Sequence, residues 1–233
     1  MASFCVIAQR RRDRALRCDS RRERRTRARA YLRDVPDELA SRSIELPSGE
    51  LRLLQPQEAA ELPDAGGVEW APLVPYWAAL WRSGVALARE LDREPLRGLR
   101  VVELGCGLAV PSLVAARAGA AVLATDACPE ALELVARNAS ASGLSVETAT
   151  VDWAEPAELL RRAPFDLVLA ADVLYERGSV APLFSLLPRL APVAWLADPG
   201  RPAADALVGQ SARRWPVETS IHGVVRIHRL RLG

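Results

Sequence analysis

The chain has 233 residues, half of them apolar, and a formal net charge of +2 at pH 7. This length suits one moderately large domain with appendages rather than two full domains. No apolar run reaches the roughly 18 residues that a transmembrane helix needs, so we expect no membrane partner. The four cysteines form no CxxC pair, and no histidine lies near them in sequence, so we also expect no bound metal.

Residues 1–34 are strongly basic, with twelve arginines against four acids, which leaves a charge of −6 for the rest of the chain. Such a segment suits a disordered extension, a targeting segment or a nucleic-acid arm. Residues 21–25 carry four arginines without interleaved aromatic residues, and no folded basic face follows. We therefore favour a disordered tail over residues 1–40 and a single folded domain over 41–233, without a nucleic-acid partner.

The start of the chain also bears on location. It is charged from Arg10 onward and has no apolar core of the kind that a cleaved secretion signal requires. We expect a soluble, cytoplasmic and monomeric protein.

The first predicted elements precede residue 98. Two short alternating runs, Ser43–Leu46 and Leu51–Leu54, flank a Pro-Ser-Gly-Glu turn, which predicts a β-hairpin. A Pro- and Gly-rich stretch, 63–75, predicts a loop. The apolar residues of 77–91 fall largely on one side of a helix, so we predict one helix from Trp77 to Leu91.

From residue 98 onward, buried strands alternate with helical patterns. We predict strands at 100–104, 121–125, 146–151, 165–170 and 193–197, and helices at 109–118, 129–142 and 180–190. This alternation implies right-handed crossovers and a parallel sheet with helices on both faces. Two last runs, joined by His222-Gly223, predict an antiparallel hairpin. The expected fold is a Rossmann-like α/β domain whose seven-stranded sheet has five parallel strands and that hairpin.

Ligands of such sheets bind beyond the carboxyl ends of the strands, so the residue types found there indicate the ligand. After the first strand, Gly105 and Gly107 permit a tight turn and close approach of a ligand. The dinucleotide fingerprint G-x-G-x-x-G fails, because its third glycine position is Val110, where a pyrophosphate would need close approach. The preceding acid, Glu103, fits a ligand with an ammonium or sulfonium group. A plain strand-to-helix turn is the alternative.

Two further strand ends carry groups suited to a nucleoside. Asp126 follows the second strand, where a carboxylate can accept hydrogen bonds from both ribose hydroxyls. Asp152 and Trp153 follow the third, where the carboxylate can bind an exocyclic amine and the indole can cover a base. Helix capping by Asp126 and core packing by Trp153 stay open. Together with the glycine turn, these groups predict S-adenosylmethionine as the cofactor.

The fourth strand end lies where a methyl group would be presented. Asp172 and Tyr175 follow it and share a face if the segment turns helically. A carboxylate and a phenol there can hold an amine and remove its proton, because only a neutral amine attacks a sulfonium. We predict these two residues to be catalytic. Capping by Asp172 and packing by Tyr175 are the alternative, and residues 198–201 form either part of the acceptor side or an ordinary turn.

The sequence resembles the seven-β-strand methyltransferases of family 16, which contain many protein lysine methyltransferases. The resemblance is carried by five segments: Trp81–Gly84, Val102–Gly107, Thr125-Asp126, Val151–Trp153 and Asp172–Tyr175. The last matches the family's acid-x-x-aromatic motif after the fourth strand. Residues 72–91 resemble in particular the branch of the electron-transfer flavoprotein β-subunit lysine methyltransferases and their bacterial relatives.

The resemblance implies contacts along the whole cofactor, from the methionine portion through the ribose to the adenine: Glu103, Gly105 and Gly107, then Asp126, then Asp152 and Trp153. It implies that Trp81 lines the cofactor pocket and that Asp172 and Tyr175 face the acceptor. The chain departs from the family at Ala109, where many members have a third glycine.

Our leading hypothesis is methyl transfer from S-adenosylmethionine to a lysine amine of a protein. A small-molecule N- or O-methyltransferase with a nicotinamide-like acceptor is one alternative. A non-catalytic interaction module with the cofactor fold is another. An NAD-dependent oxidoreductase is disfavoured by Val110 and by the lack of a candidate acid–base for hydride transfer.

Overall fold

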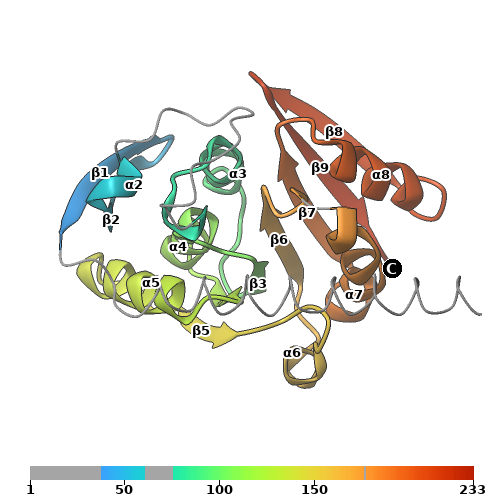
Figure 1. The fold of residues 1–233 in the computed structure, drawn as a ribbon, viewed down its shortest axis with the longest axis horizontal. Helices are drawn as coiled ribbons and strands as arrows, with labels where there is room; N and C mark the ends of the chain where they lie inside the picture. Colours follow the sequence, from blue (N-terminus) through green and yellow to red (C-terminus); the bar gives the residue numbers. More distant parts are fainter. Residues whose placement is uncertain (1–37, 61–75, 176) are drawn as a thin grey trace, which may run out of the picture. The chain divides into compact units, whose positions relative to one another are not determined.

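The computed structural model describes residues 38–60, 76–175 and 177–233 (Figure 1). The loop predicted at 63–75 lies outside these residues, as does the predicted tail up to residue 37. The first described strand begins at Leu39. No helix among the described residues is long and apolar enough to cross a membrane.

The central sheet has seven strands in the order β5-β4-β3-β6-β7-β9-β8 (Figure 1). The five parallel strands are β3 (Arg100–Leu104), β4 (Ala121–Asp126), β5 (Glu147–Thr150), β6 (Leu167–Ala171) and β7 (Val193–Asp198). The other two, β8 (Val217–His222) and β9 (Val225–Arg231), form an antiparallel hairpin, and β9 pairs with β7. The predicted sheet is confirmed. Strand order reverses between β3 and β6, which makes their carboxyl ends the switch point at which α/β sheets bind ligands.

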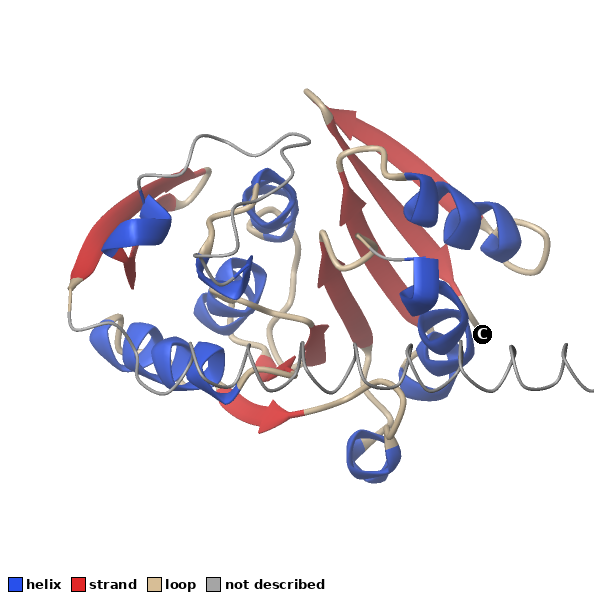
Figure 2. Cartoon of the chain, in the orientation of Figure 1, coloured by secondary structure: helices blue, strands red, loops and turns tan. Residues whose placement is uncertain are grey.

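Helices cover both faces of this sheet (Figure 2). One face carries α3 (Arg82–Leu91), α4 (Val110–Arg117) and α5 (Pro129–Ala141), and the other carries α6 (Ala157–Arg162), α7 (Val180–Leu190) and α8 (Pro202–Ser211). Side chains alternate along each strand, so that in β3 Val101 enters the core of the first face whereas Val102 and Leu104 enter that of the second. Each face therefore has its own apolar core.

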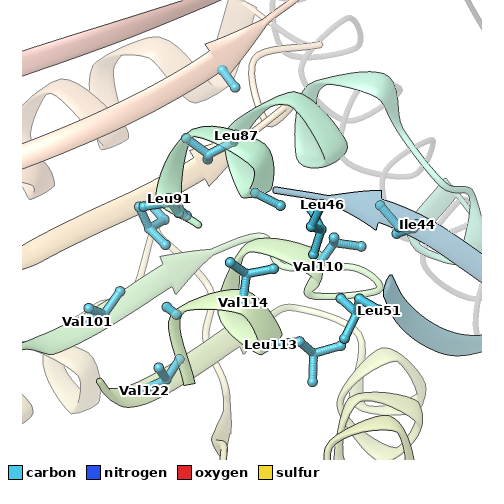
Figure 3. Close-up of a cluster of buried hydrophobic side chains, with 14 of the residues drawn as sticks. Ile44, Leu46, Leu51, Leu87, Leu91, Val101, Val110, Leu113, Val114 and Val122 are labelled. Atoms are coloured by element: carbon cyan, nitrogen blue, oxygen red, sulfur yellow. The ribbon is translucent and has the colours of Figure 1, made fainter. Parts of the chain in front are cut away.

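The predicted N-terminal hairpin is confirmed as a separate two-stranded sheet of β1 (Leu39–Leu46) and β2 (Gly49–Pro56), followed by α2 (Gln57–Ala60). Both strands are longer than the sequence pattern indicates. Ile44, Leu46 and Leu51 extend from the hairpin into the core of the first face, among side chains of α3 and α4 (Figure 3). The hairpin is thus part of the hydrophobic core.

Three local predictions need correction. The helix predicted from Trp77 to Leu91 is broken: Tyr76–Ala78 form a 3-10 turn, η1, and Trp81 is extended at the N-cap of α3. The sequence pattern misses the helices α6 and α8, because α6 is only six residues long and the alanines of α8 obscure its apolar side. The C-terminal hairpin turns at Gly223-Val224, since His222 pairs with Val225.

Candidate active site

The turn after β3 places Gly105 and Gly107 at the carboxyl edge of the sheet. Both have a left-handed backbone, with φ of 63° and 51°, which favours glycine. A Cβ on Gly105 would lie 2.9 Å from Cγ1 of Val173, and one on Gly107 would lie 2.9 Å from the carbonyl oxygen of Trp77. Packing within the protein therefore requires both glycines, in addition to any need for a ligand to approach this turn.

Asp126 connects the end of β4 to this glycine turn. Its carboxylate accepts one hydrogen bond from the backbone N–H of Gly107 and one from that of Cys128 at the start of α5, each at 2.9 Å. Burial raises the pKa of Asp126, and these two hydrogen bonds only partly offset that effect. A carboxylate has about four acceptor positions. Asp126 therefore orders the turn before α5 but does not cap that helix, whose N-cap residue is Cys128. Its carboxylate can still accept hydrogen bonds from ribose hydroxyls.

Glu103 is the next-to-last residue of β3 and is buried, with 1% of its surface exposed. Its Oε2 accepts hydrogen bonds from the backbone N–H of Ser112 at 2.9 Å and from the Ser112 hydroxyl at 2.5 Å. Desolvation outweighs these bonds and raises the pKa of Glu103 to about 8, and the nearby carboxylate of Asp126 acts in the same direction. A cation beside this pair of acids would favour their ionised forms, whereas a phosphate would not.

The segment after β5 brings an acid and an indole to the same region. Asp152 is exposed, and its Oδ1 accepts a hydrogen bond from the backbone N–H of Ala154 at 2.9 Å. The Trp153 ring lies beside the glycine turn, because a Cβ on Gly105 would be 3.3 Å from its Cζ2. Trp153 also packs against the core of the second face. Core packing thus explains part of its position without excluding contact with a base.

Asp172 follows β6 and has a left-handed backbone with φ of 59°. Its side chain is only 7% exposed. Oδ2 accepts a hydrogen bond from the hydroxyl of Ser83 at 3.1 Å, and Oδ1 accepts one from Nε of Arg201 at 2.6 Å. The segment does not turn helically, so the shared helical face with Tyr175 is absent. Tyr175 is 65% exposed and stacks on Tyr76, with ring centroids 6.4 Å apart.

Trp81 joins these groups from the start of α3. Its Nε1 donates a hydrogen bond to the carbonyl oxygen of Tyr76 at 3.0 Å, and the guanidinium of Arg201 lies 6.0 Å from its ring. Asp126 and Trp153, from the ends of β4 and β5, thus lie beside the glycine turn after β3, and Asp152 directly precedes Trp153. The predicted site residues after β6 form a second group with Trp81, Ser83 and Arg201. The partnership of Ser83 with Asp172 has no signal in the sequence, since 89 residues separate them.

Comparison with protein families gives a match over residues 77–194 to the family described as lysine methyltransferase. Protein N-lysine methyltransferase METTL21A of Danio rerio is 32% identical over 120 residues, which are 48% of this chain and 55% of that protein. Electron transfer flavoprotein beta subunit lysine methyltransferase of Rattus norvegicus is 30% identical over 195 residues, 74% of this chain and 68% of that protein. Histone-arginine methyltransferase METTL23 of Xenopus laevis is 34% identical over 107 residues, which are 43% of this chain and 46% of that protein. The chain spans about half of the length of the first and third of these relatives.

Solved structures show the same fold. One of them is the Thermus thermophilus 16S rRNA N2 G1207 methyltransferase RsmC, determined in complex with AdoMet and guanosine. The match covers 84% of this chain and 51% of the RsmC chain, with a TM-score of 0.59 and 19% sequence identity. The Pyrococcus abyssi tRNA (uracil-54, C5)-methyltransferase, in complex with S-adenosyl-L-homocysteine, matches 83% of this chain and 44% of its own at a TM-score of 0.56 and 15% identity. At this identity, the likeness shows a shared fold.

Proposed function

This chain belongs to the lysine methyltransferase family, and from that premise we propose that it transfers a methyl group from S-adenosylmethionine to a lysine amine of a protein. The observation that carries the proposal is a pair of acids beside the glycine turn at the switch point, the buried Glu103 and the half-buried Asp126. No cationic side chain among the described residues pairs with either acid. Two acids without a cationic side-chain partner favour the binding of a positively charged ligand.

S-adenosylmethionine, when bound, supplies a methyl group on a positively charged sulfonium and carries an ammonium group. We assign its methionine portion to Glu103, Gly105 and Gly107, because burial raises the pKa of Glu103 to about 8 and a neighbouring cation relieves that penalty. We assign the ribose to Asp126, whose carboxylate retains acceptor positions.

The adenine is assigned to Asp152 and Trp153, because the Trp153 ring lies beside the same turn. Trp81 lies near the acceptor residues, since its Nε1 donates a hydrogen bond to the carbonyl oxygen of Tyr76 and its ring lies 6.0 Å from the guanidinium of Arg201. Its proposed task is to border the cofactor on the acceptor side.

Asp172 and Tyr175 are proposed to contact the acceptor amine. Attack on a sulfonium requires a neutral amine in line with the methyl group, so orientation and proton control are the main tasks of the protein. The carboxylate of Asp172 is already bound by Ser83 and Arg201, and each of its oxygens keeps one further acceptor position. We therefore assign to Asp172 the orientation of the amine through an accepted hydrogen bond, and to the exposed ring of Tyr175 contact with the acceptor.

The test is to incubate the purified chain with methyl-labelled S-adenosylmethionine and a cell lysate. The proposal predicts label on protein, and loss of that label in an Asp172→Ala variant that still binds the cofactor in a calorimetric titration. Label in small molecules alone would contradict a protein acceptor. Cofactor binding without any transfer would favour an interaction module. Monomeric state and cytoplasmic location stay predictions, and light scattering on the purified chain checks the first.

A further inference from the structure

The turn after β7 fixes the backbone of Arg201. Asp198 ends β7, is 2% exposed, and accepts at its Oδ1 a hydrogen bond from the backbone N–H of Gly200 at 2.6 Å and another from that of Arg201 at 2.7 Å. Gly200 has φ of 96°, and Arg201 is extended at the N-cap of α8. Because two backbone donors converge on one buried oxygen, the start of the Arg201 side chain is set by the rigid end of a central strand.

From this point the side chain of Arg201 reaches the neighbouring strand end. Its Nε donates to Oδ1 of Asp172 at 2.6 Å, and its guanidinium lies 6.0 Å from the ring of Trp81. The two side chains of the ion pair are 27% and 7% exposed. A charge-assisted hydrogen bond of this kind, with one partner largely removed from solvent, constrains geometry more strongly than an exposed ion pair.

The orientation of the Asp172 side chain depends on hydrogen bonds from other parts of the chain. Its backbone is left-handed, and no regular structure follows it up to residue 175. Among the described residues, the hydroxyl of Ser83 donates a hydrogen bond to the second carboxylate oxygen of Asp172, at 3.1 Å. The carboxylate is therefore held from two sides, by the start of α3 through Ser83 and by the start of α8 through Arg201. No other ion pair to Asp172 is found among the described residues.

We infer that Arg201 is a positioning residue for methyl transfer: with Ser83, it holds the carboxylate of Asp172 in the orientation that accepts a hydrogen bond from the acceptor amine. The inference rests on the proposed function. Arg201 itself touches neither cofactor nor acceptor in this assignment and acts through Asp172. Asp198 contributes by fixing the backbone from which Arg201 extends.

The chain offers a closely matched control in Arg117. This arginine pairs with Asp92 at 2.9 Å, and the two side chains are 27% and 5% exposed. The pair joins the C-terminal ends of α3 and α4, whereas Ser83 and the glycine turn lie at their N-terminal ends. Arg117→Met therefore removes an ion pair of the same kind and burial away from the candidate site.

The experiment compares Arg201→Met, Arg201→Lys and Arg117→Met in methyl transfer to a protein identified by lysate labelling. We expect Arg201→Met to lower kcat/KM for the acceptor by roughly 10- to 100-fold, as loss of alignment does. The Kd for S-adenosylmethionine should stay unchanged. Arg201→Lys retains the charge without the planar guanidinium and should recover part of the loss. Arg117→Met should leave kcat/KM unchanged although it lowers the thermal midpoint.

A double-mutant cycle separates positioning from a merely structural role. If Arg201 acts through Asp172, then Arg201→Met causes no further loss in an Asp172→Asn background. Losses that multiply, or wild-type kcat/KM in Arg201→Met, overturn the inference. If Arg201→Met does not fold, the cycle is run with Arg201→Lys, and full activity of that variant overturns the inference. A wild-type chain that methylates no protein lysine overturns the proposed function as well, whereas an active wild type with an equally active Arg201→Met overturns the inference alone.

Discussion

Ala109 has the left-handed backbone that glycine adopts freely, with φ of 54° and ψ of 37°, directly before α4. A side chain in this conformation costs about 1–2 kcal/mol, whereas the greater flexibility of an unfolded glycine costs about 0.5–1 kcal/mol. We therefore expect Ala109→Gly to raise the free energy of unfolding by up to about 1 kcal/mol, measured by urea denaturation.

The matched control for this prediction is Ala115→Gly. Ala115 is fully buried inside α4, where glycine costs about 1 kcal/mol relative to alanine. The same substitution should therefore raise the free energy of unfolding at position 109 and lower it at position 115. Equal destabilisation by both substitutions would show that Ala109 is unstrained.

Glu103 gives the stability of the fold a defined pH dependence. Its pKa rises from an ordinary value of about 4.3 in an unfolded chain to about 8 in the fold, so between these values the folded state binds the proton more strongly. The contribution of this proton to the free energy of unfolding is fully present below about pH 4.3 and is lost as pH rises toward 8.

We expect the free energy of unfolding of the wild type to fall more steeply between about pH 5 and pH 8 than that of Glu103→Gln. The amide oxygen of Gln can still accept the hydrogen bonds that Ser112 donates. Urea denaturation of both proteins across this range measures the two slopes. Parallel slopes would mean that Glu103 is ionised in the fold.

At the scale of elements, Asn138 connects the N-terminal hairpin to α5. Its Oδ1 accepts a hydrogen bond from the backbone N–H of Leu54 at 2.7 Å, and its Nδ2 donates one to the carbonyl oxygen of Leu54 at 3.0 Å. Asn138 is 1% exposed. In Asn138→Ala both backbone groups lose their partner, which should lower the free energy of unfolding by about 2–4 kcal/mol.

Ser140→Ala serves as the control, since Ser140 lies exposed on the same helix. Such a surface substitution should change the free energy of unfolding by less than about 0.5 kcal/mol. If Asn138→Ala were equally mild, water would have to satisfy the exposed edge of β2. Hydrogen exchange at the amide of Leu54 would then also be fast in the wild type.

The accuracy of the sequence predictions differs among the elements for physical reasons. The parallel strands are predictable because central strands, buried on both faces, show as continuous apolar runs. The break before α3 is not predictable from the sequence. The helical spacing of apolar residues continues across the 3-10 turn and the extended residue there, through Trp77, Leu80 and Trp81. In α8 the small side chains weaken the apolar period on which such predictions depend.

At the scale of the whole molecule, topology locates the candidate site, and tertiary contacts set the state of its side chains. The switch point follows from strand order, which the alternation of strands and helices already implies, so Asp126 and Trp153 are predictable as neighbours of the glycine turn. The burial of Glu103 and the hydrogen-bond partners of Asp172 are not predictable in this way. Arg201 lies 29 residues from Asp172, and Ser83 lies 89 residues from it. No local spacing records such contacts.

The family and the fold both support methyl transfer, but relatives of this chain carry names for lysine and for arginine as acceptor. The most direct measurement is therefore the chemical identity of the labelled residue. Protein labelled from methyl-labelled S-adenosylmethionine is hydrolysed to amino acids, and the methylated amino acids are separated. We predict methyl-lysine, formed by the wild type and lost with Asp172→Ala. Label in methyl-arginine alone, or in no amino acid of any protein, would contradict the assignment of this chain to protein lysine methylation.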